Sequence, residues 1–198
     1  MKQELDEQLC QKYPKIFADR NKPMTVTAMC WGFEHSNGWY NILDRLCANI
    51  QHHIDWKNKQ RDYSIKMNKI REAGKSGNVE LFSDLMAEEY GNKGFNESFI
   101  REQAERFIRE PLKEIEDEVP QVVAMQVKEK FGTLNFYYRG GDDYIRGLVD
   151  MAESMSAITC EVCGQPGERR SDGWIKTLCE THQKEREERN LLKEGYEQ

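Results

Sequence analysis

Long apolar runs are absent from this sequence, and so is any excess of positive charge. Its longest apolar stretches span only a few residues, and the mean hydropathy is −0.86. A membrane-spanning helix needs about 20 apolar residues in a row, and a signal peptide needs a shorter apolar segment. Neither is expected here, and the first residues are polar and helix-forming. These absences predict a protein of the cytosol without a membrane partner.

Cysteine and histidine are also scarce, with six and four residues in a chain of 198. In a reducing cytosol, cysteines are expected to be free thiols or metal ligands rather than disulfides. Aromatic residues make up 10% of the chain, which is enough to build a core. At about 100 to 200 residues per domain, the length predicts one domain, or one domain with a small appendage.

The net charge of −6 hides two blocks of opposite sign. Residues 57–77 contain seven Lys/Arg and two Asp/Glu, whereas residues 78–119 contain five and twelve. Such neighbouring blocks are typical either of two binding faces or of helices that pair with each other through their charges. The sequence leaves both interpretations open. A long-range attraction of nucleic acid is not expected at this net charge.

Apolar spacing predicts the elements of a mixed body. Apolar residues from Trp39 to Ile54 recur every three or four positions, which predicts an amphipathic helix. Gly132 lies between two β-rich runs and can supply the positive φ of a hairpin turn. The expected elements are a helix over 2–13, a strand over 25–31, a helix over 39–54, a hairpin of 122–127 and 134–138, and a helix over 144–155 whose apolar face includes Tyr144 and Met155.

The hairpin carries three consecutive aromatic residues. Strand alternation places Phe136 and Tyr138 on one face and Tyr137 on the other. Aromatic residues on a sheet can stack on the bases of single-stranded nucleic acid, but they more often pack against helices. We therefore favour packing for this group.

Residues 57–119 have a helical pattern throughout. Apolar residues predict helices over 79–90 and 99–119, with a loop at 91–94 between them, and Pro111 should kink or divide the second helix. The sequence thus predicts an α+β fold with three parts. These are a helix-dominated body (1–56 and 120–157) with a small antiparallel sheet, a helical arm (57–119) that could be an insertion, and a C-terminal module (158–198) ending in a helix.

The C-terminal module contains a metal-binding motif of high specificity. Cys160 and Cys163 form a C-x2-C pair, and after fifteen residues Cys179 and His182 form a C-x2-H pair. Zinc prefers four tetrahedral ligands of this kind, and the two-residue spacing lets a tight turn direct both side chains at one ion. A hairpin ending in strand 174–178 fits between the pairs, and this order is typical of a treble-clef or zinc-ribbon module. Because protein would fill all four positions, we expect one structural Zn²⁺.

A second, looser group of possible ligands lies near the amino terminus. Cys30, His35, Cys47 and His52 match no ligand spacing, so a second zinc site is a weaker alternative. A buried thiol at Cys47 and a hydrogen-bonded histidine at His53 are the better interpretation. Cys10 is interpreted in the same way as Cys47.

Catalysis has little support in the sequence. A nucleophile needs a base within hydrogen-bond reach and a third group that orients the base. The histidines outside the zinc motif all lie within residues 35–53, without a matching serine or cysteine elbow. We therefore expect a protein that is not an enzyme. The alternative is a zinc-dependent nuclease that uses His35, His52 or His53.

Several segments resemble those of small proteins encoded by tailed phages and prophages. These segments are AMCWGF at 28–33, VKEKFGTL with FYY at 127–138, CEVCG at 160–164 and WIKTLC at 174–179. The similarity extends over 1–56 and 120–182. It implies a phage accessory protein in the host bacterial cytoplasm and carries over the four zinc ligands, but no catalytic residue.

The expected function is binding to a host bacterial protein, which the phage protein inhibits or redirects, for example a defence or nucleic-acid-processing enzyme. A negative helical surface can occupy a basic groove on such a partner. The partner-binding candidates are Glu88, Glu89, Glu102, Glu105, Glu110 and Glu114.

The alternative function is nucleic-acid binding by the basic stretch 57–77 together with the zinc module. The candidates for phosphate contacts are Lys57, Lys59, Arg61, Lys66, Lys69 and Arg71. The sequence does not indicate an oligomeric state.

Overall fold

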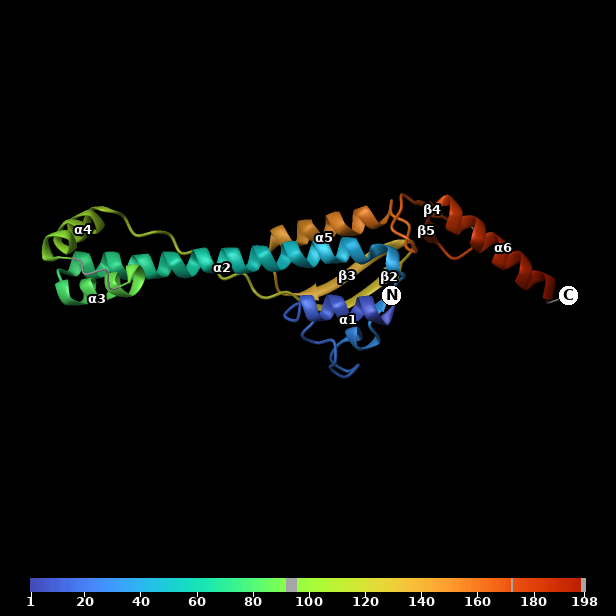
Figure 1. The fold of residues 1–198 in the computed structure, drawn as a ribbon, viewed down its shortest axis with the longest axis horizontal. Helices are drawn as coiled ribbons and strands as arrows, with labels where there is room; N and C mark the ends of the chain where they lie inside the picture. Colours follow the sequence, from blue (N-terminus) through green and yellow to red (C-terminus); the bar gives the residue numbers. More distant parts are fainter. Residues whose placement is uncertain (92–95, 172, 197–198) are drawn as a thin grey trace. The chain divides into compact units, whose positions relative to one another are not determined.

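The computed structural model describes residues 1–91, 96–171 and 173–196. The chain divides into two compact units, one of Met1–Ile54 with Val119–Gln198 and one of Asp55–Glu118. Within the described residues the fold is α+β, as predicted, with six α-helices, a three-stranded sheet and a two-stranded sheet (Figure 1). Helix α2 (Tyr40–Ser76) contributes residues to both units.

A β-hairpin lies at the centre of the larger unit. β2 (Val123–Lys130) and β3 (Thr133–Arg139) pair in antiparallel fashion. The turn residues Phe131 and Gly132 have φ angles of 53° and 84°. A two-residue hairpin turn of type I′ needs positive φ at both positions, and glycine adopts it without steric cost. The predicted hairpin is confirmed.

The sheet is mixed rather than purely antiparallel, because a third strand joins it in parallel. β1 (Phe33–Glu34) pairs with β2, so that Phe33 lies opposite Val127. A two-residue strand has too little alternation to be detected in a sequence. Its partner is also far away in the chain, so no local signal indicates the pairing.

The predicted strand over 25–31 is wrong, because Ala28–Trp31 form the 3-10 helix η1. The hydroxyl of Thr27 accepts a hydrogen bond from the Met29 N–H at 3.1 Å and donates one to the Met125 carbonyl at 3.0 Å. Side-chain hydrogen bonds of this kind give the backbone an alternative to a strand ladder. The β-branched composition of the segment therefore misled the prediction.

Helices α1 (Gln3–Lys12), α2 and α5 (Asp143–Ser156) build the core of the larger unit with the hairpin (Figure 1). α2 follows a short 3-10 turn, η2 (Asn37–Trp39). The apolar face predicted for this helix is confirmed. Its buried residues are Leu43, Leu46, Ile50 and Ile54 of α2, and Trp39 at the end of η2 is buried with them.

Helix α5 buries a narrower face than predicted. It begins after Asp142, whose carboxylate accepts a hydrogen bond from the Ile145 N–H. Tyr144 and Met155 were expected to face the core, but 59% and 45% of their surfaces are exposed. Each lies one position before a buried residue, on the edge of the face. The buried face consists of Ile145, Val149, Ala152 and Ser156.

Two α5 side chains complete the hydrogen bonds of β3. The N–H of Leu134 donates to the Ser156 hydroxyl at 2.7 Å, and the N–H of Phe136 donates to the Glu153 carboxylate at 2.8 Å. These bonds cover a strand edge that could otherwise pair with another chain. Phe136 itself is 3% exposed, which confirms packing as its role, whereas Tyr137 is exposed.

The smaller unit contains the carboxyl-terminal part of α2 with α3 (Val79–Tyr90) and α4 (Glu97–Arg109). Its core consists of Met67, Ile70, Ala73, Phe82, Met86 and Phe107. The predicted helix over 79–90 is confirmed. Of the predicted loop 91–94, residues 92–94 lie outside the described residues.

The predicted helix over 99–119 is wrong beyond Arg109. Glu110 has an extended backbone, with φ −75° and ψ 136°, and residues 111–122 belong to no helix or strand. Proline disfavours the helical conformation of the residue before it. Pro111 therefore ends the helix rather than kinking it.

Candidate metal centre

Three short elements place the four predicted ligands. Cys160 and Cys163 precede β4 (Glu168–Arg170), and Cys179 directly follows β5 (Lys176–Leu178). β4 and β5 pair in antiparallel fashion, so the predicted hairpin is confirmed. His182 lies in the first turn of α6 (Glu180–Tyr196), and the helix predicted there is confirmed.

The ligand atoms lie at the separations of a tetrahedral site. A zinc ion with bonds of about 2.3 Å to sulfur and about 2.0 Å to nitrogen requires roughly 3.8 Å between two sulfurs and roughly 3.5 Å between sulfur and nitrogen. Cys163 Sγ lies 3.8 Å from Cys179 Sγ, and His182 Nδ1 lies 3.5 Å from Cys160 Sγ and 3.1 Å from Cys179 Sγ, close to these values. All four ligand atoms lie within 4.8 Å of one another. The residues fit a four-coordinate metal ion.

Free thiols and one favoured thiolate in the cluster also suit a metal. All six cysteines of the chain are free, so no disulfide competes for these thiols. The backbone N–H of His182 lowers the pKa of Cys179 to about 6, which favours its thiolate at neutral pH. His182 presents Nδ1 to the cluster, and its Nε2 lies 3.9 Å from a Glu185 carboxylate oxygen. That distance is too long for a hydrogen bond, so Glu185 contributes a nearby negative charge on the far side of the ring.

A tight backbone turn carries the first two ligands. The N–H of Gly164 donates to the Cys160 carbonyl at 2.9 Å, and the N–H of Cys160 donates to the Gln165 carbonyl at 2.8 Å. Gly164 has φ 78°, a conformation that only glycine adopts readily. This turn directs Cys160 and Cys163 toward the same point. We call residues 160–164 the knuckle.

The knuckle rests directly on the amino-terminal part of the body, and sequence reasoning missed this contact. Gly38 donates its N–H to the Glu161 carbonyl at 2.7 Å. A Cβ atom at Gly38 would lie 2.1 Å from the Cys160 carbonyl oxygen and 2.6 Å from the Gly164 nitrogen. Only a glycine permits so close an approach between two backbones. In the sequence, Gly38 is indistinguishable from an ordinary helix-breaking glycine.

A buried carboxylate strengthens the same contact. The side chain of Glu161 is 2% exposed and forms an ion pair with Lys176 at 2.6 Å. Its other oxygen accepts a hydrogen bond from the Ser36 N–H at 3.0 Å. A buried charge is tolerated only where such partners replace water. Glu161 therefore fixes the knuckle to β5 and to the chain before α2.

Two further hydrogen bonds join the module to the body. The indole N–H of Trp39 donates to the Thr159 carbonyl at 2.9 Å, and the Thr177 hydroxyl donates to the Gly132 carbonyl at 2.6 Å. Trp39 and Thr177 are both fully buried. The cluster thus lies where the C-terminal segment meets the body, within the larger unit.

The residues suggested for a second zinc site do not form a cluster. Among the described residues, Cys30, His35, Cys47 and His52 are part of no group of three or more ligand atoms, so the suggested second site is not formed. Cys47 is completely buried, as predicted, and burial raises the pKa of its thiol. Cys10 is half-buried, and burial with the nearby Asp6 raises its pKa to about 12.

The histidines proposed for nuclease chemistry lie apart from the metal cluster. His35 is 5% exposed, and burial lowers its pKa to about 4. His53 Nε2 lies 2.8 Å from an Asp142 carboxylate oxygen, and its ring stacks on Tyr144 at 4.3 Å. His53 is thus hydrogen-bonded, as predicted. None of the histidines within 35–53 belongs to the Cys160 cluster.

In the smaller unit, the two charge blocks pair with each other. Lys66 lies 2.7 Å from a Glu89 carboxylate oxygen and 3.5 Å from one of Glu88. Arg71 is buried and donates to Glu110 at 2.7 Å. Three of the six predicted partner-binding glutamates therefore have a cation of the same chain beside them.

The remaining candidates for nucleic-acid binding and for partner binding differ in exposure. Lys57 forms an ion pair with Glu116, and Arg61 lies 3.7 Å from the neighbouring aspartate. Lys59 and Lys69 are exposed. The three remaining acidic candidates, Glu102, Glu105 and Glu114, are exposed as well.

Comparison with known proteins gives no further guide. Neither a family model, nor a curated protein, nor a solved structure matches the chain. Within the described residues, no helix has the length and apolar character needed to span a membrane.

Proposed function

We propose that Cys160, Cys163, Cys179 and His182 bind one Zn²⁺ ion with a structural role, in a module of the treble-clef or zinc-ribbon type. The tetrahedral separation of their ligand atoms carries this proposal. Three thiolates and one imidazole form a donor set that zinc favours. Four protein ligands leave no position for water or substrate, so the metal would stabilise the fold rather than take part in a reaction.

The module has little else to hold it together. Its two strands are three residues long, and among its described residues the buried apolar side chains are those of Cys160 and Leu178. Structural zinc contributes about 10 to 16 kcal/mol of apparent binding free energy at neutral pH. That is enough to order a segment of this size. Through the contacts of Gly38 and Glu161, the ordered module would then also stabilise the body.

On this scaffold, we propose that the protein is a phage-encoded accessory protein that acts by binding rather than by catalysis. The smaller unit exposes Glu102, Glu105 and Glu114. Glu102 and Glu105 lie on α4, and Glu114 lies in the segment after it. Such an acidic surface can compete for the basic groove of a nucleic-acid-processing enzyme. The resemblance of residues 1–56 and 120–182 to phage and prophage proteins supports a host bacterial protein as the partner, in the bacterial cytoplasm.

Affinity capture from bacterial lysate tests this function. The full-length protein is compared with a variant that combines Glu102→Gln, Glu105→Gln and Glu114→Gln. We expect the variant to retain its fold and to recover much less of the partner, because exposed charges control association more than stability. Equal recovery by both proteins would show that these three glutamates do not bind the partner.

A matched control makes the loss specific. Glu4→Gln, Asp150→Asn and Glu188→Gln change the net charge equally, at exposed positions of the larger unit. This control should recover the partner as the parent does.

Nucleic-acid binding is less well supported, because Lys57, Lys66 and Arg71 form ion pairs with carboxylates of the same unit. Binding through phosphates would be strong at low salt and would fall steeply as salt rises. A mobility-shift assay with DNA and RNA at low salt decides between the two functions. A shift that disappears when Lys59 and Lys69 are changed to glutamine would favour the alternative.

A further inference from the structure

A groove opens between α3 and α4 of the smaller unit. Its volume is about 720 Å³, within the range of roughly 300 to 1,000 Å³ typical of sites that enclose a ligand. The turn after α2 contributes Gly77 and Asn78 to its lining. Its lining includes Ala73, Phe82, Ile100, Ala104 and Ile108.

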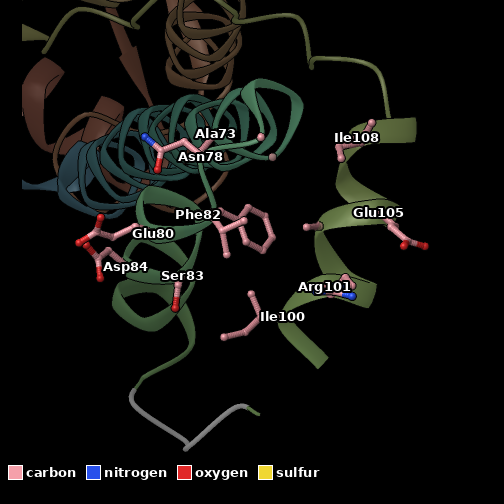
Figure 2. Close-up of a pocket in the computed structure, with 14 residues that line it drawn as sticks. Ala73, Asn78, Glu80, Phe82, Ser83, Asp84, Ile100, Arg101, Glu105 and Ile108 are labelled. Atoms are coloured by element: carbon pink, nitrogen blue, oxygen red, sulfur yellow. The ribbon is translucent and has the colours of Figure 1, made fainter. Parts of the chain in front are cut away.

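The floor of the groove is apolar. Phe82 projects from α3 and Ile100 from α4, and both side chains point into the space between the helices (Figure 2). Phe82 is 1% exposed, whereas Ile108 at the same groove is 45% exposed. The apolar surface thus continues from the core of the unit out to solvent. Such a surface favours apolar side chains of a ligand.

The charged residues that line the groove have a net negative charge. Glu80 and Asp84 lie on the α3 side and Glu105 on the α4 side, and all three point away from Phe82 (Figure 2). Arg101 is the single cation of the lining. Among the described residues, none of the three carboxylates is in an ion pair with a cation. An apolar floor with a lining of net negative charge is complementary to an apolar anchor flanked by positive charges.

We propose that this groove binds a helical segment of the partner protein that carries apolar anchors flanked by lysine or arginine. The inference rests on the proposed function, in which the smaller unit contacts a partner protein. A groove between two helices suits a third helix, whose residues at i, i+3, i+4 and i+7 form one apolar face. The net negative charge of the lining disfavours a phosphate backbone, so nucleic acid is not the expected occupant of this site.

The probe is an amphipathic helical peptide of about 18 residues with leucine at i, i+3, i+4 and i+7 and lysine elsewhere. Its binding to the full-length protein is followed by fluorescence anisotropy. A counterpart with glutamate in place of lysine tests the charge requirement. We expect the lysine peptide to bind and the glutamate peptide not to bind. Failure of the lysine peptide to bind, or equal binding of both peptides, would overturn the proposal.

Two variants locate the binding site. Glu80→Gln with Asp84→Asn removes the carboxylates on the α3 side, and the loss of two exposed charge pairs should weaken binding about fivefold. Ala104→Phe fills the groove and should weaken binding at least tenfold. If the filled variant unfolds, the charge variant alone still decides. An unchanged affinity of a folded variant would refute the site.

A matched control excludes a general effect of charge. Asp117→Asn with Glu118→Gln changes the net charge of the same unit equally at exposed positions away from the groove. This control should bind the peptide as the parent does, and an equal loss would contradict the proposal. If the partner is captured from lysate but the peptide does not bind, the groove fails and the proposed function stands. If the peptide binds but no partner is captured, the groove stands and the proposed function fails.

Discussion

Replacement of Gly38 by alanine should displace the metal-binding knuckle from the body. The added Cβ would lie 2.1 Å from the Cys160 carbonyl oxygen, 2.6 Å from the Gly164 nitrogen and 2.7 Å from the Glu161 carbonyl carbon. All three are backbone atoms, so no side chain can rotate to make room. The two backbones must therefore move apart.

Two contributions make up the expected loss in the free energy of unfolding. Overpacking of one methyl group costs about 1 to 3 kcal/mol. The separation would also stretch the 2.7 Å hydrogen bond from Gly38 N–H to the Glu161 carbonyl, and loss of a buried hydrogen bond costs about 1 kcal/mol. We expect a total loss of about 2 to 4 kcal/mol, or roughly 5 to 12 °C in melting temperature for a chain of this size. Zinc affinity should fall as well, because Cys160 lies within the displaced segment.

Urea unfolding and competition with a chromophoric zinc chelator measure the two effects. Gly147→Ala is the matched control, because nothing lies within 4 Å of a Cβ at that position. Alanine is favoured over glycine inside a helix, so this control should gain about 0.5 to 1 kcal/mol. If Gly38→Ala unfolds at the same urea concentration as the parent and binds zinc equally well, the knuckle does not rest on the body as described.

Two further predictions concern the larger unit. The buried His35 has a pKa of about 4, below its ordinary value of 6.5, so its contribution to stability is complete above pH 6.5 and is lost as the pH falls toward 4, by up to about 3 kcal/mol. Urea midpoints at pH 7.5 and pH 5 should therefore differ less in His35→Gln than in the parent, and equal differences would refute the assignment. Ser156→Ala leaves the Leu134 N–H without its acceptor and should cost about 1 to 3 kcal/mol in thermal unfolding, whereas the exposed Ser154→Ala should cost under about 0.5 kcal/mol. Similar losses in the two serine variants would contradict the role of Ser156 at the strand edge.

The sequence predicted those features whose signal is local. The two-residue spacing of Cys160 and Cys163 identifies the metal cluster without any knowledge of the fold. Gly132 between β-rich runs indicates the hairpin, and the apolar stripe from Trp39 to Ile54 indicates the start of α2. Each of these depends on residues close together in the chain.

Features that depend on distant contacts could not be predicted. The pairing of Phe33 with Val127 joins segments far apart in the chain, and composition alone does not reveal such a partner. The close approach of Gly38 to Cys160 is invisible for the same reason. The burial of Glu161 contradicts the usual exposure of glutamate, and only Lys176 and the Ser36 N–H explain it.

The most direct test of the account is elemental analysis of the full-length protein purified without added metal. We expect one zinc per chain, loss of that zinc in Cys163→Ser, and a lower melting temperature of the parent after chelation. A purified protein without a bound transition metal would contradict it, and so would a Cys163→Ser variant that keeps both the metal and the melting temperature of the parent.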